Sequence, residues 1–248
     1  MYVTRARTKL IAVIILAAAT AGLAAPAQAR IIGTDLEVIL GSSTASALEQ
    51  RYGLYSDPPQ QQRIEKLGKE MVAVSGRAAL SYRFGVLNTK EINALAVPGG
   101  WIYVTRGLVD AKVPDDELAF VLGHEVAHVA QRHGVDQLEK SLGLSLALGL
   151  VFDRSATTQA LVSDLLQLLL ERGYSRKDEY AADKAAVGYM LQTGHKPQGG
   201  VEFLHRLQAL SKHKPSDLER WFATHPPMDD RIARLEEDIA VAEKEGSH

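Results

Sequence analysis

The sequence predicts an α+β fold that is mostly α-helical, with a small antiparallel sheet beside one long helix. Two patterns lead to this expectation. Apolar residues recur at helical spacing in several segments, and three short strand-like runs separated by turns fall between residues 80 and 105. With 248 residues, 46% of them hydrophobic and 23% charged, the chain can bury the core of an ordinary globular domain.

Charge and cysteine content exclude several classes of protein and site. The formal net charge is -2, and no Lys/Arg-rich run stands out after the N-terminus, so we expect no nucleic-acid partner. The absence of cysteine excludes disulfides, thiolate zinc ligands and a cysteine nucleophile.

Residues 1–29 have the pattern of an export signal peptide. Basic residues near the N-terminus precede the apolar stretch Leu10–Ala25, and Ala27-Gln-Ala29 offers a small-residue cleavage site. Because the apolar stretch is short for a full membrane span, removal is favoured. We expect a periplasmic chain that begins at Arg30; an uncleaved segment that anchors the protein to the inner membrane is the alternative.

The next part of the chain contains helical patterns followed by strand patterns. Helices are expected over residues 36–52 and 60–74, separated by Ser56-Asp-Pro-Pro59. The expected strands are residues 80–87, 92–97 and 101–105, with a turn at Pro98-Gly-Gly100. An edge of this sheet could hold an extended peptide by main-chain hydrogen bonds, or the sheet could simply cover the helices.

A helix with the motif HEVAH follows the strands. Pro114 suits a first helical position, and no helix breaker follows until Gly134. His124 and His128 are one turn apart and can bind a single ion, while Glu125 is rotated enough to reach a water on that ion. These side chains lie against an apolar stripe and need partners, for which zinc is suited; a chance match in an amphipathic helix is the alternative.

Two strongly apolar segments come next, residues 138–152 and 160–170. Both are too short to span a bilayer, so we expect a buried helical hairpin. An exposed patch that contacts a membrane or a partner is the alternative.

The segment Ser175–Asp183 predicts a second helix that carries candidate site residues. Ser175 and Asp178 resemble a capping box, and Gly194 ends the helix. Glu179 and Asp183 share a face, so Glu179 could be a third metal ligand and Asp183 could bind the free nitrogen of a ligating histidine. A solvated acidic face is the alternative.

The last informative segment is Thr224-His-Pro-Pro-Met-Asp-Asp-Arg-Ile232. Its two prolines are expected to start a helix that continues to about residue 244. His225 precedes this helix and Arg231 lies about one turn inside it. By residue type alone, His225 and His133 are ordinary capping or surface histidines, with His133 near the negative end of its helix.

Taken in order, HEVAH, SRKDEYAAD and THPPMDDRI resemble the zinc metallopeptidase family that includes the CAAX prenyl protease, HtpX, BepA and the mitochondrial Oma-type proteases. Residues 93–110 are similar to the family's segment before the zinc helix. The resemblance covers residues 63–235 and implies a zincin-like fold. We expect a catalytic domain over 61–248 after an N-terminal extension, 30–60, as a minimal member without the membrane spans or repeat domain of some relatives.

The resemblance also implies roles for individual residues. His124, His128 and Glu179 would be the zinc ligands, Glu125 the general base, and Asp183 a hydrogen-bond partner outside the ligands.

Further from the metal, the resemblance implies that His225 is a resting ligand or a stabiliser of the transition state, and that Arg231 serves the same cleft. The expected substrate-pairing edge strand comprises Asn93, Ala94, Leu95 and Ala96.

The sequence thus predicts an endopeptidase with one Zn²⁺ per chain that hydrolyses unfolded or misassembled cell-envelope proteins through a metal-activated water. Polypeptides would be its partners, with peripheral membrane contact through residues 141–152 as a further option. The rival prediction is a catalytically silent, zinc-binding periplasmic chaperone or assembly factor.

Overall fold

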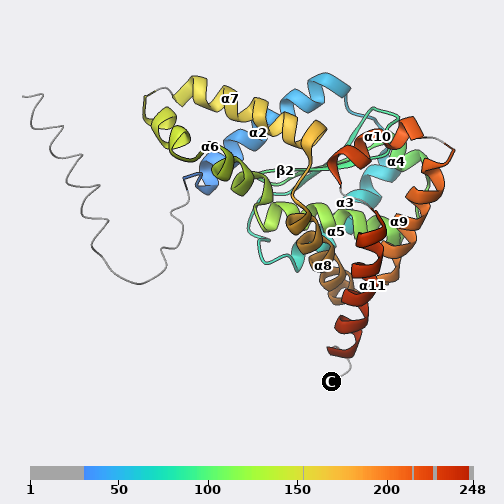
Figure 1. Ribbon diagram of the computed structural model, residues 1–248. Helices are drawn as coiled ribbons and strands as arrows, with labels where there is room; N and C mark the ends of the chain where they lie inside the picture. The colour runs from blue at the N-terminus through green and yellow to red at the C-terminus, as the bar shows by residue number, and fades with distance from the viewer. Residues whose placement is uncertain (1–30, 153, 214, 226–227, 246–248) are drawn as a thin grey trace, which may run out of the picture. The chain divides into compact units, whose positions relative to one another are not determined.

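Helix α5 (Asp115–Ala130) is the element against which much of the chain packs (Figure 1). Every residue from Glu117 to Val129 is buried. The carboxylate of Glu117 is paired, because Arg206 donates two hydrogen bonds of 2.7 Å to it. The helices that pack most extensively on α5 are α3 (Pro58–Ala73), α8 (Arg176–Thr193) and α9 (Gln198–Ser211).

The computed structural model describes residues 31–152, 154–213, 215–225 and 228–245. The predicted export signal, residues 1–29, lies outside the described residues, as do the two prolines predicted to start the last helix. The other helical elements are α2 (Thr34–Tyr52), α4 (Arg106–Asp110), α6 (His133–Phe152), α7 (Arg154–Gln167), the π-helical turn η1 (Leu168–Arg172), α10 (Pro215–Thr224) and α11 (Met228–Glu245). The prediction of a mostly helical α+β fold is confirmed.

The sheet is small and mixed, with the strand order β1 (Arg83–Leu87), β3 (Trp101–Thr105), β2 (Ala94–Val97). β2 and β3 form an antiparallel hairpin, with Leu95 opposite Tyr103. β1 pairs with β3 in parallel, so the expectation of a wholly antiparallel sheet is wrong for this pair. Successive strands alternate in direction, and residues 88–93 carry the chain past the position of β3. The first and third strands, which share a direction, therefore become neighbours.

α6 and α7 pack together as a helical hairpin, as the two apolar segments predicted. Leu138 of α6 and Leu165 of α7 are buried in one cluster with Leu40 of α2. The side chains of residues 144–148 and 150–154 are not described, so membrane contact through residues 141–152 stays a prediction. Within the described parts of the chain, no helix combines the length and apolarity that a bilayer span requires.

α8 begins and ends where its sequence signals predict. Ser175 accepts a hydrogen bond from the amide of Asp178 at 3.3 Å, and its hydroxyl donates to the Asp178 carboxylate at 2.7 Å. Gly194 ends the helix in a left-handed conformation, with φ of 78°. This register turns Glu179 and Asp183, one helical turn apart, into the protein interior, where both are buried.

A buried ion-pair cluster joins α2 to the end of α5. Glu37 has no exposed surface, and Arg77 donates hydrogen bonds of 2.8 and 2.7 Å to its two carboxylate oxygens. Arg132 pairs with the same carboxylate and also donates to the carbonyl of Ile32 at 2.5 Å. The Gly99 amide donates a further hydrogen bond to Glu37 at 3.2 Å. One carboxylate thus holds α2, the segment after α3, the β2–β3 turn and the turn after α5 together.

Replacing Glu37 with alanine is expected to lower the free energy of unfolding by about 3–5 kcal/mol, because it leaves two arginines as uncompensated charges at a largely buried site. The matched control is Glu65→Ala, which removes a carboxylate paired with exposed Lys69 at 3.1 Å. That change should cost less than about 1 kcal/mol. Urea denaturation measures both values. Equal destabilisation by the two variants would contradict a structural role for the Glu37 cluster.

Candidate metal centre

The ionisable residues that the sequence singled out converge at one buried place. α5 contributes three of them, α8 contributes two, His225 directly follows α10, and Arg231 comes from α11. None of them is more than 6% exposed. The full set is His124, Glu125, His128, Glu179, Asp183, His225 and Arg231.

Three of these side chains present ligand atoms to a common point. The Nε2 atoms of His124 and His128 lie 3.0 Å apart, and the Glu179 carboxylate lies 3.7 Å from the first and 3.4 Å from the second. A tetrahedral zinc ion with bonds of about 2.0–2.1 Å requires ligand atoms about 3.3 Å apart. The three side chains are therefore positioned to bind a metal ion.

The Glu179 carboxylate gives an independent test of this fit. Both of its oxygens are buried, and neither accepts a hydrogen bond from the described residues. A buried carboxylate without hydrogen bonds is costly, because nothing replaces the water it has lost. A cation between Glu179, His124 and His128 would remove that cost, so the residues present fit a metal ion.

Asp183 is held on both sides by charged or polar partners. Arg231 donates hydrogen bonds of 2.8 and 2.7 Å to its two oxygens, and Nδ1 of His124 lies 2.8 Å from it. Burial alone would raise the pKa of Asp183, but the charge and hydrogen bonds of Arg231 and the hydrogen bond of His124 hold it well below its ordinary value. Asp183 is thus an ionised acceptor that fixes the ring of His124.

Glu125 lies in the same buried pocket but forms no ion pair with any of the residues that the structure describes. Burial raises the pKa of its carboxyl to about 7. One of its oxygens accepts no hydrogen bond from the described residues. A carboxyl with a pKa near neutrality can both accept and release a proton, which is what general acid–base chemistry requires.

His225 is rigidly placed beside the centre. Its ring stacks on Trp221, with centroids 4.1 Å apart and planes 9° apart. Its Nδ1 lies 3.0 Å from the Thr224 hydroxyl and 3.3 Å from the Trp221 carbonyl, which leaves Nε2 for the metal side. Burial lowers its pKa to about 3, so the ring is a neutral imidazole. His225 also forms a second possible metal-binding group with His124 and Glu125.

The predicted substrate strand lies next to the centre but is covered. Residues 93–96 are all buried, and a cavity of about 10 Å³ separates β2 from Glu125 and His225. Such a volume holds about one water molecule. The π-helical turn η1 lies on the other side of this cavity.

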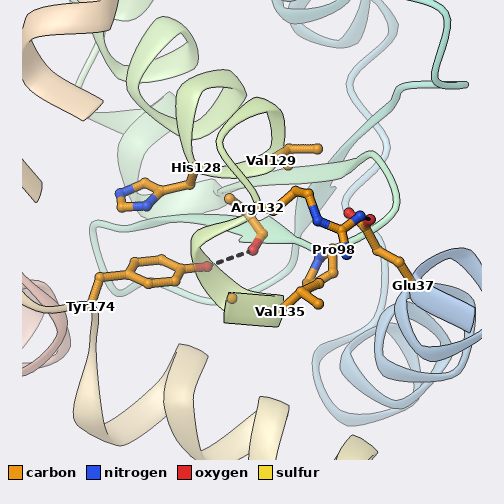
Figure 2. A pocket seen from close by; sticks show the side chains of 9 residues that line it. Glu37, Pro98, His128, Val129, Arg132, Val135 and Tyr174 are labelled. Atoms are coloured by element: carbon orange, nitrogen blue, oxygen red, sulfur yellow. Dashed lines mark hydrogen bonds and ion pairs between the residues drawn. The ribbon is translucent and has the colours of Figure 1, made fainter. Parts of the chain in front are cut away.

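The hydrogen-bond register shows which atoms of β2 could meet a peptide. The amide of Thr105 donates to the carbonyl of Asn93, and in an antiparallel ladder bonded residues alternate. Ala94 and Ala96 therefore turn their main-chain groups to the free edge. The hydroxyl of Tyr174 donates to the Ala96 carbonyl at that edge, at 3.1 Å. Figure 2 marks the hydrogen bond of this hydroxyl with a dashed line.

Sequence reasoning missed two residues at the centre, His133 and Tyr174. His133 is 7% exposed and contacts His128, so the interpretation as an ordinary capping or surface histidine is wrong. The Tyr174 ring stacks on the His128 ring, with centroids 4.0 Å apart (Figure 2). The only sign of either residue in the sequence was its position near a predicted motif. His133 follows His128 by five residues, and Tyr174 directly precedes the residue that caps α8.

Together, the HExxH helix, the carboxylate from a second helix and the adjacent edge strand define a metallopeptidase, a hydrolase that acts on polypeptides. The sequence model of Peptidase family M48 matches residues 58–239, and the chain belongs to this family.

Three relatives illustrate the similarity. The Beta-barrel assembly-enhancing protease of Escherichia coli (strain K12) is 28% identical over 88% of this chain and 50% of its own length. The Mitochondrial metalloendopeptidase OMA1 of Schizosaccharomyces pombe is 27% identical over 86% of this chain and 64% of its own. Metalloprotease YcaL of Escherichia coli (strain K12) is 27% identical over 72% of this chain and 69% of its own length. The chain thus spans about half the length of the first of these relatives.

The Arg231 pairing yields a stability prediction for the metal-free protein. Replacing Arg231 with methionine leaves Asp183 and Glu179 buried without their cation and should lower the free energy of unfolding by about 3–5 kcal/mol. Arg234→Met is the matched control on the same helix, because Arg234 is exposed and its guanidinium lies over the Tyr180 ring. It should cost about 1 kcal/mol or less. Denaturation in the presence of a chelator measures both, and a small effect of Arg231→Met would contradict the assigned pairing.

Proposed function

We propose that this protein is a zinc-dependent endopeptidase that hydrolyses peptide bonds in unfolded or misassembled cell-envelope proteins. The observation that carries the proposal is the Glu179 carboxylate, which is buried, accepts no hydrogen bond from the described part of the chain, and faces Nε2 of both His124 and His128. Family membership supports the peptidase chemistry.

His124, His128 and Glu179 would hold one zinc ion per chain. When bound, zinc supplies a Lewis acid that lowers the pKa of water and polarises the scissile carbonyl group. Asp183 accepts a hydrogen bond from Nδ1 of His124 and so keeps Nε2 of that ring free to act as a ligand.

Glu125 would act as the general base. Its carboxylate accepts the proton of the attacking water, and the resulting acid then delivers that proton to the leaving amine nitrogen. Two features support this role: Glu125 neighbours His124 in the helix without joining the ligand triad, and it faces the cavity beside β2.

His225 and Arg231 would play different parts. His225 faces the cavity next to Glu125. With its hydrogen on Nδ1, donated to the Trp221 carbonyl, the ring is suited to be an extra ligand at rest; with its hydrogen on Nε2 it is suited to donate to negative charge on the carbonyl oxygen. The contacts of Arg231 go to Asp183 and Glu179, with its Nη1 3.5 Å from the latter. They favour a positioning role for Arg231 over direct contact with substrate.

The substrate would bind as an added strand on the free edge of β2. Main-chain groups of Ala94 and Ala96 face this edge, and a substrate would replace the hydrogen bonds that the Ala94 amide now makes to the Asn93 side chain and the Ala96 carbonyl to Tyr174. Pairing through the main chain suits unfolded polypeptides of varied sequence. Binding requires Tyr174 and η1 to move away from β2, because the present cavity has room for about one water.

Envelope proteins are proposed as substrates for two reasons. Residues 1–29 have the composition of an export signal, which implies a periplasmic site of action. Moreover, one relative is named for enhancing β-barrel assembly. An inner-membrane protein that retains residues 1–29 as an anchor is the alternative.

The chemistry is tested by Glu125→Gln. This variant should retain zinc and fold but hydrolyse casein about 10²–10⁴-fold more slowly, because a glutamine cannot accept the proton. Asp115→Asn is the matched control: it removes one negative charge from an exposed position on the same helix and should leave the rate unchanged. Rates and zinc content are measured for all three proteins.

Two results would separate the proposal from its rivals. Zinc in the wild type without any hydrolysis would indicate either a centre blocked by His225 or a silent zinc-binding chaperone. Of these two, only the blocked centre should gain activity when His225 is replaced with alanine. Separately, equal hydrolysis rates for the wild type and Glu125→Gln would contradict the assignment of Glu125 as the base.

The export proposal predicts a mature chain that begins at Arg30. N-terminal sequencing of the protein from a periplasmic fraction would identify this residue. Ala29→Phe should block processing, because signal peptidases require small residues at that position, and the precursor should then accumulate. A wild-type chain that keeps residues 1–29 and fractionates with membranes would support the anchored alternative instead.

A further inference from the structure

His128 belongs to two histidine pairs: its Nε2 faces His124 in the proposed metal centre, and its Nδ1, on the opposite side of the ring, faces His133. Nδ1 of His133 is 2.8 Å from Nδ1 of His128. We infer that His133 is a positioning residue for the hydrolytic reaction, which orients His128 and fixes its tautomer so that Nε2 is free to bind the metal. The inference rests on the proposed function, in which His128 is a zinc ligand.

The geometry leaves one arrangement of hydrogens that suits a metal site. Nε2 of His128 faces His124 and Glu179, so it must carry a free lone pair when a metal binds. The hydrogen of neutral His128 is therefore on Nδ1, and it is donated to Nδ1 of His133. His133 then carries its own hydrogen on Nε2, which lies 4.0 Å from the Asp178 carboxylate.

This arrangement completes a pattern that Asp183 begins. Asp183 accepts from Nδ1 of His124 at 2.8 Å, and His133 does the same for His128 at an equal distance. Hydrogen-bond partners on the outer nitrogen hold ligand rings in place and raise their basicity, and losing one typically weakens metal binding about 10–100-fold. Each histidine of the proposed triad thus has its own acceptor.

The chain conformation around His133 supports a positioning function. Arg132 has a φ of 62°, a left-handed conformation that is uncommon for a residue with a side chain. This residue turns the chain between α5 and α6, so that His133 faces back toward α5. Figure 2 shows the Arg132 side chain extending to Glu37, which fixes the turn from α2. The stacked ring of Tyr174 holds His128 from another side.

His133→Leu and His133→Gln test the inference. Leucine has no hydrogen-bond acceptor, so the zinc dissociation constant should rise about 10–100-fold. Glutamine has a side-chain carbonyl that can accept from His128, and it should restore most of the lost affinity. His195→Leu is the matched control, because His195 is partly buried and bonded to Glu70 and Asp116 but touches no residue of the centre.

Zinc affinity is measured by competition with a chelator, and unfolding of each metal-free variant is measured alongside. Nitrogen-15 NMR of the zinc-loaded wild type should show His128 protonated at Nδ1. The expected result is weaker zinc binding in His133→Leu alone, with metal-free stability close to that of His133→Gln.

Three outcomes would overturn the inference. Unchanged affinity in His133→Leu would show that His128 needs no acceptor. Equal losses in the leucine and glutamine variants, with parallel losses of metal-free stability, would reduce His133 to a packing residue. A wild type that binds no zinc would remove the proposed function itself, which the first two outcomes leave intact.

Discussion

The enclosure of two carboxylates in the interior, at Glu179 and Asp183, is the constraint on which the rest of the structure depends. Arg231 supplies one positive charge against these two negative charges. The Glu179 carboxylate accepts no hydrogen bond from the described residues and faces Nε2 of His124 and His128, and a divalent cation is the partner whose charge and ligand preference fit. α5, α8 and α11 are held in register by this single electrostatic arrangement, so the folded core and the reactive centre are built from the same contacts.

Much of this centre could be predicted from the sequence, because its parts are local. His124 and His128 are related by one helical turn, and Ser175 sets the start of the helix that carries Glu179. Residues whose roles depend on distant segments could not be predicted this way. His133 faces the centre only because Arg132 takes a left-handed conformation, and that conformation is fixed by Glu37, far away in sequence.

The sheet illustrates the same limit. The three strands could be predicted from short strand-like runs separated by turns, and the third strand has the expected bounds, Trp101–Thr105. The order in which strands pair depends on the topology of the chain, which such local runs do not encode. Similarly, the resemblance to the family implied an edge strand at residues 93–96, but the sequence could not show that Tyr174 and η1 cover it. Local sequence patterns were sufficient to predict where the strands lie. Which elements pair with them or cover them depends on packing between segments that are distant in sequence.

The cluster around Glu37 has a practical consequence for anyone who prepares a fragment of this protein. Sequence similarity to the family spans residues 58–239, and that range invites a shortened version starting near residue 58. Such a fragment would lack both Glu37 and Ile32, to which the side chain of Arg132 binds in the described structure. The residues that match the family model therefore do not include all the residues that stabilise its core.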